Sequence, residues 1–142
     1  MADFEGEHGV WQYDETAPQG EPGGFGAVYL GVGPEGARAA VKVVPPIPGA
    51  RGDAVRNREA AILARTNEVD SDRLIRMLDI GMRGDDLCIA LELADGSLLV
   101  SADGLPVDEA VAILHAIAAA LADLCHRNPS QGPQAGQRPA NR

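Results

Sequence analysis

The sequence has few cysteines and no long apolar run, and each shortage excludes a class of protein. The two cysteines, Cys88 and Cys125, lie in apolar surroundings without the spacing of metal ligands, which predicts a reduced, cytoplasmic protein. The longest apolar stretch, residues 111–124, is interrupted by His115 and Asp123 and is too short to cross a bilayer. The acidic start lacks the basic and then apolar layout of a secretory signal.

Positive charge is also scarce. Only 12 basic residues stand against 21 acidic ones, which gives a formal net charge of -9 and repels nucleic acid and anionic lipid. We therefore expect neither nucleic acid nor a membrane as a partner. The nearest approach to a basic cluster is formed by Arg51, Arg56 and Arg58, which we expect to lie on a solvated helix face.

What the chain does contain is the apolar content of one modest domain, at 45% of 142 residues. Residues 1–19 are polar and weakly patterned, which predicts a loose N-terminal tail with one edge strand near residues 10–13. Apolar runs bounded by glycine and proline predict four strands, over residues 27–32, 37–44, 74–80 and 87–93. Apolar residues at helical spacing predict two helices, over residues 54–65 and 107–126.

The two helices differ in how clearly their apolar face is marked. Asp53 is expected to cap the first helix, whose buried side has four residues available: Ala54, Ala61, Ile62 and Ala64. The second helix has a continuous apolar stripe, made of Val107, Val111, Leu114, Ile117, Ala118, Leu121 and Leu124. The order of elements predicts a small antiparallel sheet with one helix packed on it, followed by a long helix.

Three features in order along the chain point to chemistry with phosphate. Gly23, Gly24 and Gly26 form a glycine-rich turn whose backbone N–H groups can approach an anion closely, although for the glycines alone a flexible turn is the better explanation. Lys42 lies among apolar strand residues and supplies a positive charge, or else simply reaches solvent. Glu59 can hold that lysine in place; a surface glutamate is the alternative, but its i+4 neighbour is leucine, so no local ion pair explains it.

Together these features resemble the N-lobe of a protein kinase of the serine/threonine type. The matching segments are Gly23-Gly-Phe-Gly-Ala-Val-Tyr, Ala40-Val-Lys42 and Arg58-Glu59. Residues 74–81 and 87–98 look like the fourth and fifth strands and the hinge, and residues 105–126 look like the long helix before the catalytic loop. The resemblance covers roughly residues 20–127.

The resemblance implies an α+β fold and an ATP site. The expected domains are an N-terminal tail (1–19), a kinase-like N-lobe with ATP-binding loop and hinge (20–95), partial C-lobe helices (96–127) and a disordered tail (128–142). The implied nucleotide-binding residues are Gly20, Gly23, Gly24, Phe25, Gly26, Val28, Ala40, Lys42, Leu91, Glu92 and Ala94. Lys42 would contact the α- and β-phosphates and pair with Glu59, and these two are the implied catalytic residues.

The other implied roles follow the order of the family's lobe. The glycines would cover the phosphates, with Phe25 at the loop tip, and Val28 and Ala40 would form an apolar roof over adenine. Leu91 would be the gatekeeper, and Glu92 and Ala94 would offer hinge backbone groups to the adenine edge. One departure is that Glu21 stands where the family has its first glycine; Gly20 is one position early, as though the turn-stiffening Pro22 were inserted.

The residues that perform phosphoryl transfer in this family are missing. The family uses H-R-D-x-x-x-x-N and D-F-G to supply the base and the Mg²⁺ ligands, and the nearest match here, His126-Arg127-Asn128, lacks the aspartate. An intact form would transfer the γ-phosphate of ATP to serine or threonine of a protein substrate, with Mg²⁺. We expect this chain to be inactive alone. The alternatives are a non-catalytic, pseudokinase-like module that binds a nucleotide or a regulated protein, and a non-functional gene product.

The final segment suggests a hypothesis about its origin. Residues 130–141 can be encoded so that the frame displaced by one nucleotide reads H-R-D-L-K-P-A-N-V-L-L, the catalytic-loop sequence of a serine/threonine kinase. The hypothesis is that this tail is a frameshifted reading of a once-complete kinase gene, or of one with a sequencing error, which the nucleotide sequence of the locus tests directly. The apolar stripe of the last helix would then lack its usual cover, which predicts self-association.

Overall fold

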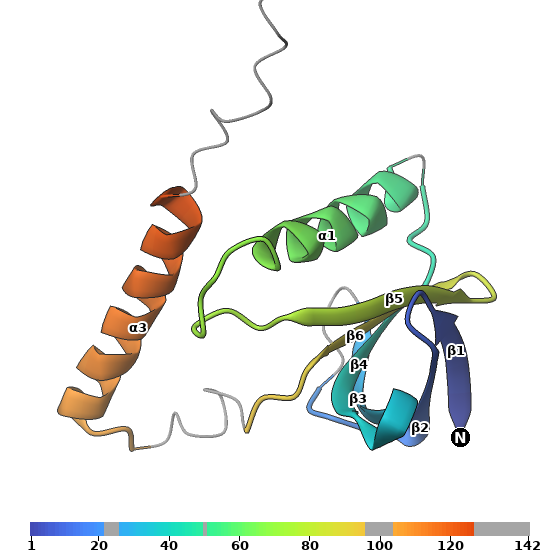
Figure 1. Cartoon of the computed structure of the whole chain (residues 1–142), viewed down its shortest axis with the longest axis horizontal. Coiled ribbons are helices and arrows are strands. Elements are labelled where there is room, and N and C mark those ends of the chain that lie inside the picture. Colours follow the sequence, from blue (N-terminus) through green and yellow to red (C-terminus); the bar gives the residue numbers. More distant parts are fainter. Residues whose placement is uncertain (22–25, 50, 96–103, 127–142) are drawn as a thin grey trace, which may run out of the picture.

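The computed structural model describes residues 1–21, 26–49, 51–95 and 104–126. Within these ranges the chain forms six strands, two α-helices and one short 3-10 helix. In chain order they are β1 (Ala2–Gly6), β2 (Val10–Pro18), β3 (Ala27–Val32), η1 (Pro34–Gly36), β4 (Arg38–Val44), α1 (Gly52–Thr66), β5 (Met77–Arg83), β6 (Asp86–Glu92) and α3 (Val107–His126). Figure 1 shows the strands gathered on one side, with α1 beside them and α3 standing apart.

The strands close into an antiparallel barrel in the order β1-β2-β3-β4-β6-β5. β1 pairs with β2 along its length and returns to β5, where Glu5 faces Met82 and Gly6 faces Gly81. The predicted fold class, a kinase-like N-lobe with a small sheet and one packed helix, is therefore wrong. The segment 1–19, expected to be a loose tail with one edge strand near residues 10–13, instead supplies both β1 and β2. The expected strand lies within β2, which is paired on both sides and is not at an edge.

The physical reason for the closure is an apolar alternation at the start of the chain. Ala2 and Phe4 on β1, and Trp11 and Tyr13 on β2, are each at most 3% exposed, whereas the residues between them are exposed. Successive side chains of a strand point to opposite faces. These four residues therefore pack inside the barrel, on a cluster whose other members are Ala39, Val41, Cys88 and Ala90.

Two glycines and one aspartate allow β1 to pair with β5 and so close the barrel. A Cβ on Gly6 would run into the Asp79 carboxylate, and one on Gly81 would run into the carbonyl oxygen of Glu5, so both positions require glycine. The Asp79 carboxylate accepts hydrogen bonds from the Trp11 indole at 2.7 Å and from the backbone N–H groups of Glu7 at 2.8 Å and His8 at 3.0 Å. The turn between β1 and β2 is therefore fastened to β5.

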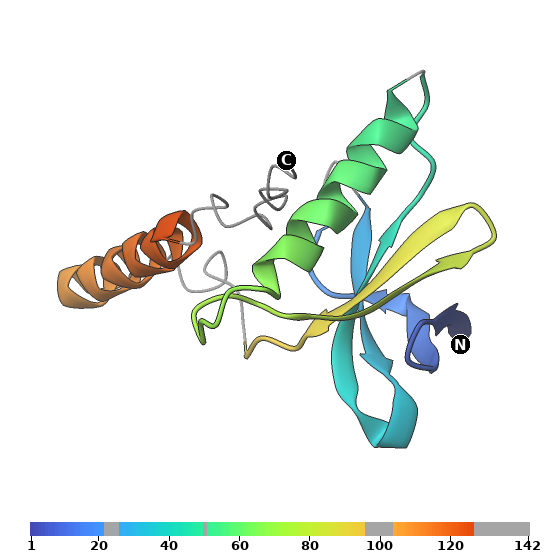
Figure 2. The ribbon, with the colours of Figure 1, turned by 45° about the horizontal axis from the view of Figure 1, so that its top comes forward.

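Helix α1 lies along the outside of the barrel (Figure 2), where it covers a second apolar cluster. Val44, Leu87 and Ile89 are buried there, and Ala60 and Leu63 of α1 pack against them. The buried side predicted for this helix is wrong, because its four residues, Ala54, Ala61, Ile62 and Ala64, are exposed. The inward row instead holds Gly52, Arg56, Ala60 and Leu63, at spacings of three to four residues.

Two finer expectations for α1 also change. Arg56 is only 8% exposed and donates to the carbonyl oxygen of Asp85 at 2.7 Å, so the solvated face expected for this arginine is wrong; Arg51 and Arg58 are exposed. The N-cap residue is Arg51, with no side-chain cap hydrogen bond, and Asp53 lies within the first turn.

Helix α3 has the bounds expected from its apolar stripe, and none of its residues is buried. Its Asp123 accepts a 2.6 Å hydrogen bond from the Ser71 hydroxyl and lies 3.5 Å from an Arg73 guanidinium nitrogen, and both partners lie between α1 and β5. The predicted disordered tail, 128–142, lies outside the described residues, as does part of the predicted segment 96–127.

Candidate functional site

Strand β4 places Lys42 on the outer face of the barrel, under α1. Ala39 and Val41 of this strand are fully buried in the barrel interior. Because side chains alternate along a strand, Lys42 points to the opposite face, as does Val44, which lies under α1. The apolar residues around this lysine therefore determine which way its ammonium group extends.

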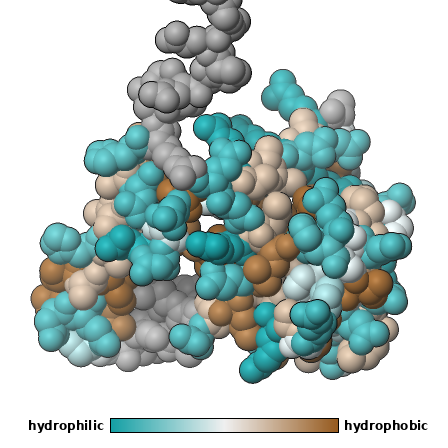
Figure 3. All heavy atoms as spheres, viewed as in Figure 1, coloured by the Kyte–Doolittle hydropathy of each residue, from teal (hydrophilic) through white to brown (hydrophobic). Residues whose placement is uncertain are grey.

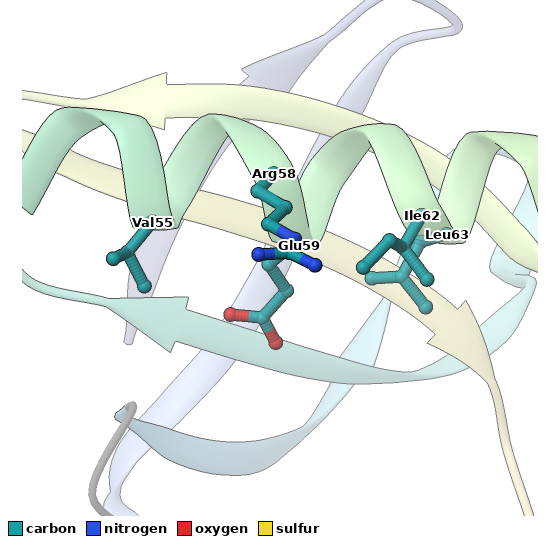
Figure 4. A pocket seen from close by; sticks show the side chains of 5 residues that line it. All are labelled: Val55, Arg58, Glu59, Ile62 and Leu63. Carbon is teal, nitrogen blue, oxygen red and sulfur yellow. The ribbon is translucent and has the colours of Figure 1, made fainter.

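Helix α1 brings Glu59 to the same place. Glu59 immediately precedes Ala60, which packs on the barrel, so its side chain starts at the edge of the contact between helix and sheet. Figure 4 shows the carboxylate extending from the helix towards the strands behind it. Lys42 Nζ donates a hydrogen bond to Glu59 Oε1, and each side chain is 24% exposed. The structure thus brings together the two residues that were predicted to pair.

Three predicted apolar residues share this face of the sheet. Val28 on β3 lies directly opposite Lys42, and Leu91 on β6 lies directly opposite Ala40. Residues opposite one another in a sheet project to the same side, and Ala40 and Lys42 are two apart on one strand. Val28, Ala40 and Leu91 are half-buried, which leaves part of each open to a ligand beside the ammonium group.

The glycine-rich turn is described only at its two ends. Gly26 has φ +112°, and a Cβ there would run into the carbonyl oxygen of Val43, so only glycine lets β3 approach β4 at this point. Gly20 has φ +77° and open space around it. The turn is closed at its base by a 2.7 Å hydrogen bond from the Gln19 N–H to the Val28 carbonyl. Gly23, Gly24 and Phe25 lie outside the described residues.

The predicted hinge residues follow the end of β6. The Glu92 N–H donates to the Arg76 carbonyl at 2.8 Å, and the Glu92 carboxylate accepts from the Arg76 N–H at 3.2 Å. The N–H of Glu92 is thus engaged, and its carbonyl is the backbone group that it could offer to a ligand. Ala94 is exposed, two residues beyond the last residue of β6.

A cavity that the sequence did not reveal lies on the α1 side of Glu59. Its volume is about 370 Å³, and its lining residues are Val55, Arg58, Glu59, Ile62 and Leu63 (Figure 4). Val55 and Ile62 are 38% and 52% exposed. Among the described residues, Glu59 is the member of the predicted site that lines this cavity. The spacing of Val55, Glu59 and Ile62, at i, i+4 and i+7, is the sequence signal that marks this face.

Within the ranges that the structure describes, no group of three or more histidine, cysteine, aspartate or glutamate side chains could hold a metal ion. Among those same residues, no helix is long and apolar enough to span a membrane.

The arrangement around Lys42 offers one fixed cation beside an apolar strand face. Such a pair of features can bind a phosphate and a flat apolar ring at the same time.

Comparison with known proteins identifies no family for this chain. The chain matches no protein-family model, and no curated protein matches it either.

Proposed function

We propose that this chain binds ATP, with Lys42 against the phosphates and the strand face of Val28, Ala40 and Leu91 against the adenine. The observation that carries the proposal is the ion pair between Lys42 and Glu59 on the outer face of the barrel. An ammonium group held by a carboxylate is already placed for phosphate oxygens, so less conformational entropy is lost on binding. The proposal depends on these side chains and not on the predicted lobe.

We further propose that an intact form of the protein is a serine/threonine kinase, which transfers the γ-phosphate of ATP to a protein substrate with Mg²⁺. Support comes from the order of the glycine turn, Lys42 and Glu59, and from the meeting of the last two side chains. The sequence of this chain contains neither the H-R-D nor the D-F-G motif, so the chain alone should bind the nucleotide without transferring phosphate.

A second candidate is a non-catalytic, pseudokinase-like module that binds a protein. The cavity beside Glu59 favours this alternative, because Val55 and Ile62 expose apolar surface on α1, and such surface on a helix often marks a contact site. In that case the ion pair would position α1 for a partner instead of holding a nucleotide.

Calorimetric titration of the full chain with ATP and Mg²⁺ tests the proposal. Lys42→Met should weaken ATP binding by about tenfold or more, which is about 1.4 kcal/mol, because the phosphates lose their cation. Arg38→Met is a matched control on the same strand, since it removes one exposed positive charge at the far end of β4. Equal affinities for the wild type and Lys42→Met, or no binding at all, would contradict the proposal.

A further inference from the structure

We propose that two copies of this chain associate through the apolar face of α3, packed side by side as an antiparallel helix pair. Helix α3 carries six large apolar residues whose exposed fractions range from 36% to 80%: Val107, Val111, Leu114, Ile117, Leu121 and Leu124. Figure 3 shows brown, apolar surface gathered on α3. The inference is separate from ATP binding, because it uses no residue of the Lys42 site.

The contact between α3 and the rest of the chain leaves this apolar face open. Asp123, which binds Ser71, follows Leu114 by nine residues and Leu121 by two. At about 100° per residue, Asp123 lies about 180° and 200° around the helix from these leucines. The helix thus turns the side that carries Asp123, Ala119 and Ala120 towards the barrel and turns the face of Leu114 and Leu121 outward.

The apolar face has the spacing of a two-helix seam. Val107, Val111, Leu114, Ala118, Leu121 and Cys125 are separated alternately by four and three residues. This repeat is the one that lets two helices interlock along their length. The seam includes the exposed Cys125 at its C-terminal end.

Charge at the helix ends selects the antiparallel direction. The first turn carries Asp108 and Glu109, and the last turn carries His126. A parallel pair would bring the acidic turns together and align the two helix dipoles, whereas an antiparallel pair sets each N-terminus beside a C-terminus. The seam then places Leu114 against Ala118 of the second copy, so that a large side chain meets a small one, and Val107 against Cys125 of the second copy.

The size of the face fits a second copy better than the chain's own C-terminal residues. A 20-residue helix is about 30 Å long and about 10 Å wide, so a pair buries on the order of 1,000 Å², at the low end for a specific dimer. Residues 128–142 contain no apolar side chain larger than proline or alanine and cannot fill the seam. We therefore expect a dimer with a micromolar dissociation constant.

Sedimentation equilibrium of the full chain over a range of concentrations tests the association. Ile117→Glu should weaken the dimer by about tenfold or more, because Ile117 flanks the seam beside Ala118, close to the two-fold axis at position 116, where the variant would bring the carboxylates of both copies near one another. Ile75→Glu is the matched control, since Ile75 and Ile117 are both 48% exposed; it should leave the dimer intact. Fluorescence of the buried Trp11 reports whether each variant folds.

Disulfide trapping tests the direction. In the Val107→Cys variant, oxidation should link the introduced thiol of one copy to Cys125 of the other, and peptide mapping identifies the bond. Cys88 should not take part, because it is fully buried and burial raises the pKa of its thiol. A Cys125–Cys125 bond between copies would overturn the antiparallel arrangement. A monomeric wild type at every concentration, or a dimer that survives Ile117→Glu, would overturn the interface itself.

Discussion

At the scale of single residues, the Asp79 carboxylate is notable because it is buried and accepts hydrogen bonds from several donors of the protein. Its side chain has no exposed area, and it accepts from the Trp11 indole, from the backbone N–H groups of Glu7 and His8, and from its neighbour Ile80 at 2.9 Å. A buried carboxylate is tolerated only when it is satisfied in this way. Asp79 thus fixes the β1–β2 turn that closes the barrel.

Replacing this carboxylate tests its role. Asp79→Asn keeps the shape but turns an amide NH₂ towards groups that are themselves donors, so the variant should lose about 2 to 3 kcal/mol of unfolding free energy. Urea unfolding followed by Trp11 fluorescence measures the loss. Asp85→Asn, in the exposed turn between β5 and β6, is the control and should change stability little. An unfolding free energy unchanged by Asp79→Asn would contradict the role.

The same carboxylate should make stability depend on pH. Burial alone would raise the pKa of Asp79, but the hydrogen bonds from Trp11 and from the backbone N–H groups outweigh burial and lower the pKa below its ordinary value. A carboxyl whose pKa is lower in the folded state stabilises the fold above its unfolded pKa, near 3.9. The wild type should therefore lose more stability than Asp79→Asn as the pH falls from about 5 to about 2.

At the scale of elements, β1 is the strand that turns an open sheet into a barrel. Phe4→Ala should cost about 3 kcal/mol, because it removes a side chain that is 3% exposed from the barrel interior. Val10→Ala is the control in the same hairpin, since Val10 is 51% exposed. Chemical denaturation of both variants checks this. If Phe4→Ala were neutral, residues 1–6 would behave as the loose tail that the sequence suggested.

The elements that the sequence predicted well are those with a local signal. Strands β3, β4 and β6 and helix α3 were visible from apolar alternation or helical spacing within one segment. Closure was not visible, because it depends on Gly6 meeting Gly81 and on Asp79 reaching residues about 70 positions away. No local sequence pattern predicts a pairing between strands so far apart in the chain. In addition, β1 itself carries only two buried apolar residues, Ala2 and Phe4.

Helix α1 was predicted with nearly correct bounds but with the wrong face. Its inward row contains Gly52 and Arg56, which apolar periodicity does not count, whereas Val55 and Ile62 are exposed beside Glu59. The candidate site was nevertheless predictable in part. Alternation along β4 set the direction of Lys42, and a helix following that strand supplied Glu59; the cavity beside them depends on the face that was misjudged.

At the scale of the whole molecule, the formal net charge of -9 opposes association of two copies. Salt screens repulsion between exposed charges, with a Debye length of about 10 Å at 0.1 M, and does not weaken apolar contact. Raising the salt concentration should therefore strengthen the proposed α3 dimer, as measured by sedimentation. A dimer that dissociates in salt would instead point to an interface held by ion pairs.

The account depends most on Lys42, which is the only lysine in the chain. An amine-specific reagent can therefore modify two sites, the Lys42 side chain and the N-terminal amine, and mass spectrometry distinguishes them. The N-terminus serves as an internal reference, because it adjoins β1 and not the proposed site. The account predicts that ATP slows modification of Lys42 and leaves the N-terminus unaffected; equal rates at both amines with and without saturating ATP would contradict it.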